Sequence, residues 1–404
     1  MSRKILTIVC DGMADLPIEE LDGKTPLEYV NPGNINSLVP DSIIGLARTV
    51  PQGMNPGSDT ANLSIFGYNP EKYYTGRAPL EAVSMGINLG PGDAAFRCNL
   101  VNISDGIMND FTADHIETAF SGLVMEKLNA ALGSDDIEFH KGVSYRNALV
   151  WRNYPYSELP ETVPPHDITN LQIDEYFPSG SGSDLLKNIF ELSGRLLKEN
   201  DFSETGFKGK PTNTWIWGGG FKPALDSFKS LYNLEGYTIS AVDLIHGIGI
   251  AAGLQPKFVE GVTGYIDTNY IGKAKAAIEC LKEKDYVFLH FESPDESGHE
   301  GNIEHKIKSI RDIDEIAISY LLTEIKQFDD ITLIIMPDHP TPISLRTHTS
   351  DPVPFLVYST GRLDVPSGYK NQEIVFNEKT CAASGLYIDD ASTLLSKSIS
   401  GKFE

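Results

Sequence analysis

The stretch ILTIVCDG, residues 5–12, decides the fold of this chain, because a short and mainly apolar run, partly β-branched, leads directly into Asp11. Such a run is typical of a strand buried on both faces. Similar runs recur at residues 43–50, 214–217, 237–242, 286–291 and 331–336. Helical patterns lie between the later runs, at residues 224–232, 271–283 and 302–327. This alternation predicts an α/β fold with a doubly wound, mostly parallel sheet covered on both faces.

One stretch in the first half of the chain has a different character. Residues 95–103 and 144–151 alternate between apolar and polar side chains, and residues 154–165 form a proline-rich connection. Alternation of this kind is typical of strands in an antiparallel sheet with one exposed face. We therefore expect a main domain of residues 1–91 and 196–404 and a smaller inserted α+β domain of residues 92–195.

The charge and the apolar runs limit the possible partners. The 404 residues carry a formal net charge of −23, which repels nucleic acids and anionic membrane surfaces. The start, MSRKILTIVC, is too short in its apolar part for a signal peptide, and no apolar run approaches membrane-spanning length. These features predict a cytoplasmic protein without nucleic-acid or membrane partners, and they carry no signal for an oligomeric state.

Acidic residues and histidines follow three of the predicted strands. Because the carboxyl ends of parallel strands meet at one edge of a sheet, these side chains should lie close together. Carboxylate oxygens and imidazole nitrogens together suit manganese, zinc, iron or magnesium better than calcium, which prefers oxygen alone. The candidate metal ligands are Asp11, Asp295, His299, Asp338, His339 and His348.

Ser58 is a candidate seventh ligand and a candidate nucleophile. It stands in PGSDTANLSIFGY, where Pro56 and Gly57 form a turn and residues 59–66 are predicted to form a helix. Backbone amides and the helix dipole favour an incoming phosphate at such a position. A bound cation would also lower the pKa of the serine hydroxyl. The alternative is that Ser58 only caps its helix, a role that serine favours.

With these residues in place, the sequence resembles the alkaline phosphatase superfamily and, within it, the archaeal type of 2,3-bisphosphoglycerate-independent phosphoglycerate mutases. The resemblance runs in order from residue 5 to about residue 356. The matching motifs are DGMADLP at Asp11, GKTPLE at Gly23, PGSDTANLSIFGYNPEKYYTGRAPLEA at Pro56, FRCNL at Phe96, WGGG at Trp217, AVDLIHGIGIAAG at Ala241, GVTGYIDTNY at Gly261, SPDESGHEG at Ser293, and DHPTP and THTSDPVPF near the end.

The resemblance implies a phosphatase-like metal-binding domain with an inserted lid domain that binds substrate. It implies that Ser58 becomes phosphoserine. One divalent ion would be held by Asp11, Ser58, Asp338 and His339, and a second by Asp295, His299 and His348. Mn²⁺ is the expected metal, with Mg²⁺, Zn²⁺ or Co²⁺ as alternatives.

Five residues of the inserted part and its border are candidates for substrate binding. Arg77, Arg97 and Arg146 could grip phosphate and carboxylate, because a guanidinium binds either in a bidentate way. His166 and Asp167 could act as acid and base. The alternatives are that the arginines form structural ion pairs and that Asp167 caps the segment after it.

The expected reaction is the interconversion of 3-phosphoglycerate and 2-phosphoglycerate, small phosphorylated substrates, without bisphosphoglycerate. One alternative is a homoserine kinase of the same superfamily, which would use the same serine and metals. Another is a metal-dependent phosphatase that releases the phosphoryl group to water.

Overall fold

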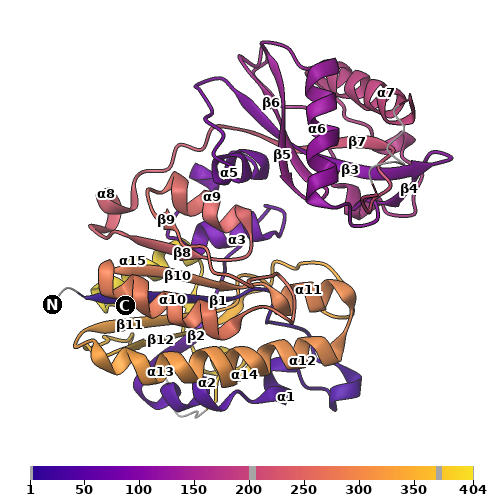
Figure 1. Cartoon of the computed structure of the whole chain (residues 1–404). Helices are drawn as coiled ribbons and strands as arrows, with labels where there is room; N and C mark the ends of the chain where they lie inside the picture. The colour runs from indigo at the N-terminus through magenta and orange to yellow at the C-terminus, as the bar shows by residue number, and fades with distance from the viewer. Residues whose placement is uncertain (1–2, 200–205, 370–374, 404) are drawn as a thin grey trace. The chain divides into compact units, whose positions relative to one another are not determined.

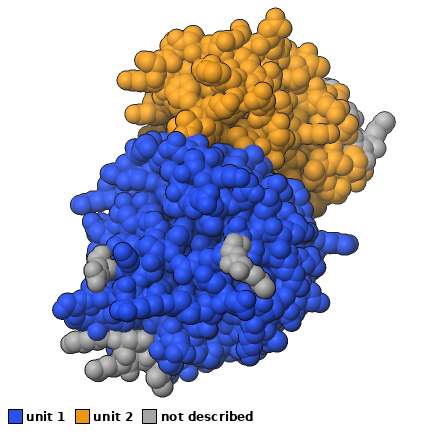
Figure 2. All heavy atoms as spheres, turned by 90° about the vertical axis from the view of Figure 1, so that its left-hand side faces the viewer, with its two compact units in different colours: residues 1–74, 225–404 blue, residues 75–224 orange. Residues whose placement is uncertain are grey.

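A computed structural model describes residues 3–199, 206–369 and 375–403 of the chain. The chain divides into two compact units, which Figure 2 colours separately. Unit 1 comprises residues 1–74 and 225–404, and unit 2 comprises residues 75–224.

The main sheet of unit 1 has eight strands in the order β13-β2-β12-β11-β1-β10-β8-β9 (Figure 1). They are β1 (Lys4–Cys10), β2 (Ser42–Ala47), β8 (Gly236–Ile239), β9 (Gln255–Pro256), β10 (Tyr286–Phe291), β11 (Ile331–Met336), β12 (Val353–Ser359) and β13 (Tyr387–Ile388). Strand β1 pairs in parallel with both β10 and β11. Strand β12 runs antiparallel to both of its neighbours, β11 and β2. The predicted α/β fold with a mostly parallel sheet is confirmed.

Helices cover both faces of this sheet. They are α1 (Pro26–Val30), α2 (Gly33–Leu38), α3 (Ser58–Ile65), α4 (Pro70–Tyr73), α8 (Phe228–Tyr232), α9 (Asp243–Ala251), α10 (Tyr270–Glu283), α11 (Ser293–Glu300), α12 (Ile303–Asp312), α13 (Ser319–Glu324), α14 (Glu378–Ala383) and α15 (Leu394–Ser400). The helical pattern at residues 302–327 is thus interrupted, and a π-helical segment, Ile313–Ile318, joins α12 to α13.

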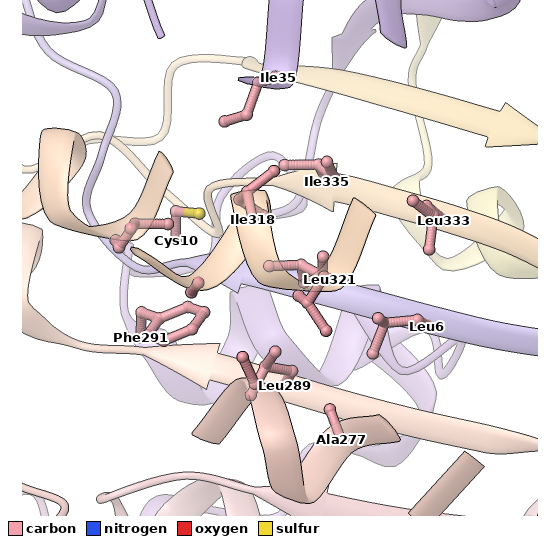
Figure 3. Packing of buried hydrophobic residues seen from close by; sticks show 14 of the residues in the cluster. Leu6, Cys10, Ile35, Ala277, Leu289, Phe291, Ile318, Leu321, Leu333 and Ile335 are labelled. Atoms are coloured by element: carbon pink, nitrogen blue, oxygen red, sulfur yellow. The ribbon is translucent and has the colours of Figure 1, made fainter. Parts of the chain in front are cut away.

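The core of unit 1 follows from the alternation of side chains along the strands. Leu289 and Phe291 of β10 face a cluster that includes Ala277 of α10 and Leu321 of α13 (Figure 3). On the opposite face, Phe288 of the same strand stacks on Phe66 at the end of α3, with ring centroids 3.8 Å apart. Both faces are therefore buried, as the uninterrupted apolar runs predict.

Unit 2 is built on an antiparallel sheet. Its strands are β3 (Ala94–Ser104), β4 (Ile107–Asp110), β5 (Ile137–Val143), β6 (Arg146–Trp151) and β7 (Asn213–Phe221), and its helices are α5 (Arg77–Ser84), α6 (Thr118–Leu132) and α7 (Ser183–Glu199). Strand β3 lies between β6 and β7 and pairs with β4 at its far end. The run at residues 214–217 was predicted as a strand of the parallel sheet, and that prediction is wrong, because it belongs to β7.

Unit 2 is wider than the expected insertion of residues 92–195. It begins at residue 75 because Ala78 and Ala82 of α5 pack on Ala95 and Val150 of its sheet. It extends to residue 224 because β7 pairs with β3. The glycines of WGGG lie within β7, where a Cβ on Gly219 would approach a ring carbon of Phe96 to 2.4 Å. They allow close packing of this strand against its neighbour β3.

Within the described residues, no helix is long and apolar enough to cross a membrane.

Candidate functional site

The candidate site of unit 1 lies where β1, β10 and β11 end at their carboxyl edge. Asp11 follows β1 directly, and Asp338 follows β11 after one residue. Asp295 lies in the first turn of α11, which begins shortly after β10. Because β1 is hydrogen-bonded to both other strands, the three carboxylates converge although they are remote in the sequence.

Asp11, Asp338 and His339 form one group, and each is fully buried. One atom of each residue lies within 4.8 Å of the others. His339 Nε2 is 3.3 Å from Asp338 Oδ2 and 3.7 Å from Asp11 Oδ1. The amide of Gly12 donates to Asp338 Oδ1 at 3.1 Å, which ties the loops after β1 and β11 together.

Ser58 faces this group from the first position of α3. Gly57 is the N-cap residue of α3, and Ser58 is the first residue of the helix itself. The capping alternative for Ser58 is therefore wrong. Ser58 Oγ lies 3.2 Å from His339 Nε2, and the residue is only 7% exposed. One turn along α3, Asn62 Nδ2 donates to Asp338 Oδ2 at 2.8 Å, which holds α3 against the carboxylate. The serine hydroxyl is therefore held inside the polar group.

Asp295, His299 and His348 form a second group. His299 Nε2 lies 3.2 Å from Asp295 Oδ2, and His348 Nε2 lies 3.4 Å from Asp295 Oδ1. Although burial opposes the charged form, the two histidines hold the pKa of Asp295 well below its usual value. Burial also works against charge on His299, but Asp295 raises its pKa to about 9. An ionised Asp295 beside a protonated His299 is thus favoured here.

Thr341 connects the two groups. Its hydroxyl donates to Asp295 Oδ1 at 2.5 Å and lies 3.2 Å from His339 Nδ1. Since the hydroxyl hydrogen is used on Asp295, Nδ1 of His339 is the donor in the second contact. Burial lowers the pKa of His339 to about 4, so the ring is neutral near pH 7. Nε2 of His339 therefore presents its lone pair toward Ser58.

The chemistry of these residues fits divalent cations. Asp11 Oδ1 is buried and accepts no hydrogen bond from any residue that the structure describes. Burial, followed by the carboxylates of Asp338, Asp295 and Glu292, raises the pKa of Asp11 well above its usual value. A cation would offset this repulsion and occupy the unsatisfied oxygen. The mixed carboxylate and imidazole donors suit transition metals and magnesium better than calcium.

Unit 2 brings the three predicted arginines together around one acid, Glu81 of α5. Glu81 makes ion pairs of 2.9 Å with Arg77 and with Arg97. Although burial favours the neutral acid, Arg97, Arg77 and Arg146 hold the pKa of Glu81 below its usual value. The structural ion-pair alternative thus describes Arg77 and Arg97 in this state, whereas Arg146 lies at the start of β6 and is exposed.

His166 and Asp167 lie beside this arginine cluster in unit 2. The rings of His166 and Trp217 have centroids 5.5 Å apart, and Arg97 Cζ lies 4.4 Å from the centre of the Trp217 ring. His166 Nε2 is 3.6 Å from Asp167 Oδ1, and both side chains are about half exposed. Asp167 lies within the 3-10 turn Pro165–Ile168, whose N-cap is Pro164. Asp167 is therefore not the N-cap of this turn.

Several polar residues that contact the predicted ligands or their loops were not identified from the sequence. Among them are Asn62, His290, Lys306 and Thr341. Asn62 had a usable signal, because a residue four positions after Ser58 lies on the same helix face. His290 lies inside an apolar strand run, where an isolated histidine carries no indication of its neighbours.

The comparisons with known proteins agree with one another. Residues 40–202 match the family described as 2,3-bisphosphoglycerate-independent phosphoglycerate mutase. A protein from Geobacter sulfurreducens, named a probable 2,3-bisphosphoglycerate-independent phosphoglycerate mutase, is 44% identical over 97% of this chain and 98% of its own length. The mutase of this name from Methanosarcina acetivorans is 46% identical over 93% and 95% of the two chains.

Two solved structures are similar over nearly the whole chain. A protein from Pyrococcus horikoshii matches with a TM-score of 0.80 and 27% identity, covering 99% of this chain and 97% of the other. The cofactor-independent phosphoglycerate mutase from Thermoplasma acidophilum matches with a TM-score of 0.63 over 99% of both chains. At 23% identity, this second likeness bears on the fold alone.

Proposed function

The chain belongs to the family of 2,3-bisphosphoglycerate-independent phosphoglycerate mutases, and we propose that it interconverts 3-phosphoglycerate and 2-phosphoglycerate through phosphorylated Ser58. The observation that carries the proposal is the position of Ser58 Oγ, which lies at the start of α3 and 3.2 Å from His339 Nε2. The hydroxyl is thus held next to the buried carboxylates and at the start of a helix, where the helix dipole favours a phosphoryl group.

The reaction consists of two phosphoryl transfers. In the first, Ser58 Oγ loses its proton and forms a bond to phosphorus, while the bond from phosphorus to the C3 oxygen breaks and that oxygen takes up a proton. Glycerate then reorients without leaving. In the second, the C2 hydroxyl loses its proton and takes the phosphoryl group, and the Ser58 hydroxyl is restored. The balance needs no bisphosphoglycerate and no water.

Two divalent cations complete the proposed site, with Mn²⁺ as the preferred ion and Mg²⁺, Zn²⁺ or Co²⁺ as alternatives. Asp11, Ser58, Asp338 and His339 would hold one, and Asp295, His299 and His348 the other. Bound there, the cations would lower the pKa of the serine hydroxyl and stabilise negative charge on the transferred group.

The residues of unit 2 are proposed to bind and orient the glycerate. Arg77, Arg97 and Arg146 would bind its carboxylate and phosphate, with Arg146 the most accessible of the three in this state. His166 and Asp167, both accessible, would exchange protons with the two substrate oxygens. Exclusion of water from the site would protect phosphoserine from hydrolysis. We also propose a cytoplasmic location, where small phosphorylated metabolites of this kind are found.

The test is a substrate comparison with the purified full chain and Mn²⁺. We expect 2-phosphoglycerate from 3-phosphoglycerate, detected by phosphorus NMR, and phosphate on Ser58, detected by mass spectrometry of the quenched enzyme. The Ser58→Ala variant should lose the activity, whereas Ser64→Ala, which alters a buried serine of the same helix, should retain it.

Two results would overturn the proposed function. One is formation of O-phosphohomoserine from ATP and homoserine with no mutase activity, as the kinase alternative requires. The other is release of inorganic phosphate from 3-phosphoglycerate without 2-phosphoglycerate, as a phosphatase requires.

A further inference from the structure

His290 is a fully buried histidine that contacts the candidate ligand Asp11 but has no role in the proposed reaction. Its Nε2 atom lies 3.0 Å from Asp11 Oδ2, and both side chains are inaccessible to solvent. On the other side of the ring, Nδ1 lies 3.2 Å from the hydroxyl of Ser240. Both ring nitrogens of His290 therefore have a polar partner.

The partners determine which ring nitrogen carries the hydrogen. With a cation bound, Asp11 is an ionised carboxylate that only accepts hydrogen bonds, so Nε2 of His290 is the donor to Asp11. In a neutral ring, Nδ1 is then the acceptor, and Ser240 supplies the hydrogen. The Ser240 hydroxyl can do so because it accepts a separate bond from the amide of Val242 at 2.9 Å. Glu292 Oε2 lies 3.6 Å from Nδ1, beyond hydrogen-bond reach.

The two carboxylate oxygens of Asp11 have different surroundings. Oδ2 accepts from His290, while Oδ1 accepts no hydrogen bond from a described residue and lies 3.7 Å from His339 Nε2. The contact with His290 therefore fixes the rotation of the carboxylate with Oδ1 turned toward the ligand group. The backbone of His290 is fixed as well, because buried Lys273 donates to its carbonyl at 2.9 Å.

We propose that His290 is the positioning residue of Asp11, since its Nε2–H holds Oδ2 so that Oδ1 is directed to the cation. The inference rests on the proposed use of divalent cations at this site. Asp11, His290 and Glu292 also lie close enough together to resemble a third ligand set. In the assigned tautomer Nε2 has no lone pair to offer a metal, so His290 orients a ligand and is not one itself.

The experiment measures binding of Mn²⁺ alone by isothermal titration calorimetry. The starting protein is the full chain with His299→Ala, which disables the Asp295 group. The calorimeter then measures Mn²⁺ binding at the Asp11 group. We expect His290→Leu in this background to weaken Mn²⁺ binding about 10- to 100-fold, the usual effect of losing such a partner. His290→Gln should restore most of the affinity, because its amide nitrogen can donate from nearly the same position.

A matched control separates positioning from packing. His246 of α9 is a second buried histidine, and it contacts Thr238 and the carbonyl of Ser240 but no carboxylate among the described residues. We expect both His246→Leu and His290→Leu to lower the thermal midpoint, and His246→Leu to leave Mn²⁺ affinity within a factor of about 3 of the background protein.

Three outcomes would overturn the inference. Unchanged affinity in His290→Leu would show that Asp11 needs no such partner. Affinity as low in His290→Gln as in His290→Leu, with fewer Mn²⁺ ions bound, would make His290 a ligand. Absence of binding in the background protein would show that the Asp11 group does not hold a cation by itself. Because the readout is metal binding, these outcomes are distinct from failure of mutase activity.

Discussion

Thr341 is the residue on which the geometry of both ligand groups depends most directly. Its single hydroxyl donates to Asp295 and accepts from His339, so one side chain orients a ligand in each group. It also determines that Nε2 of His339 presents a lone pair toward Ser58. Such outer partners of metal ligands contribute to activity without touching the substrate.

Replacing Thr341 by valine tests this role, because valine has nearly the same shape and lacks the hydroxyl. We expect mutase activity to fall about 10- to 100-fold, since two ligands lose a partner at once. Thr341→Ser keeps the hydroxyl and should retain most of the activity. Steady-state kinetics at saturating Mn²⁺ would check this, and equal activity in the valine variant and the unaltered protein would contradict it.

At the scale of elements, α12 holds together the loops that carry the ligands. Lys306 of α12 is fully buried, and its Nζ atom donates to Asp15 Oδ2 at 2.6 Å and to the carbonyl of Thr341 at 2.7 Å. A third contact, of 3.3 Å, goes to the carbonyl of Ala14. One ammonium group therefore links the loop after β1 to the loop after β11.

We predict that Lys306→Met destabilises the chain by about 3–5 kcal/mol, because it leaves the buried carboxylate of Asp15 without its cation. The control is Lys308→Met in the same helix. Lys308 is half exposed and pairs with Asp312, so its loss should cost under about 1 kcal/mol. Urea unfolding followed by circular dichroism gives both values. Similar losses in the two variants would count against the linking role.

The loop after β1 also contacts α14 through Glu378. This carboxylate accepts from the Thr25 hydroxyl at 2.8 Å and from the amide of Asp15 at 3.3 Å. Burial nevertheless raises the pKa of Glu378 to about 7, above its ordinary value of 4.5. The folded state thus favours the neutral acid at this position.

A pH dependence of stability follows from this shift. Between pH 4.5 and about 7 the folded chain binds the proton more tightly than the unfolded chain, so stability falls as the pH rises through this window. The contribution is fully present below pH 4.5 and lost above about pH 7. In this window Glu378 should lower the free energy of unfolding of the unaltered protein by about 1.4 kcal/mol per pH unit. We expect Glu378→Gln to lack this contribution. Urea unfolding measured at half-unit steps of pH gives this dependence for both proteins. The same pH dependence in the variant and the unaltered protein would refute the assignment.

At the scale of the whole molecule, the buried carboxylates couple stability to metal. Asp11 and Asp338 are fully buried near Asp295, and their mutual repulsion opposes folding unless a cation is bound. A ligand that binds only the folded chain stabilises it in proportion to the logarithm of its concentration.

Removal of metal with EDTA should therefore lower the thermal midpoint. Restoring Mn²⁺ at about 100 times its dissociation constant should raise the free energy of unfolding by about 2.7 kcal/mol for each site that it fills. The Asp338→Asn variant removes one buried charge, so its midpoint should respond less to EDTA. Differential scanning calorimetry measures both shifts, and identical responses in the two proteins would be inconsistent with binding at Asp338.

The sequence alone determined the strands around Asp11 and Asp338 and the helix that begins at Ser58. These features are local, because the apolar period, the β-branched residues and the turn before the helix are encoded in neighbouring positions. The parallel pairing of strands then brought the strand-end acids together, so most candidate ligands could be predicted without coordinates. The family motifs added their expected roles.

Only the tertiary structure decided which sheet received residues 214–217 and which residues support the ligands. The local pattern of this run is the same for a strand of either sheet, and its partner β3 is more than 100 residues earlier in the chain. His290 and Asp11, likewise, are 279 residues apart. Contacts between remote segments depend on how whole elements pack, and no periodicity within one segment encodes the identity of the side chain that it will meet.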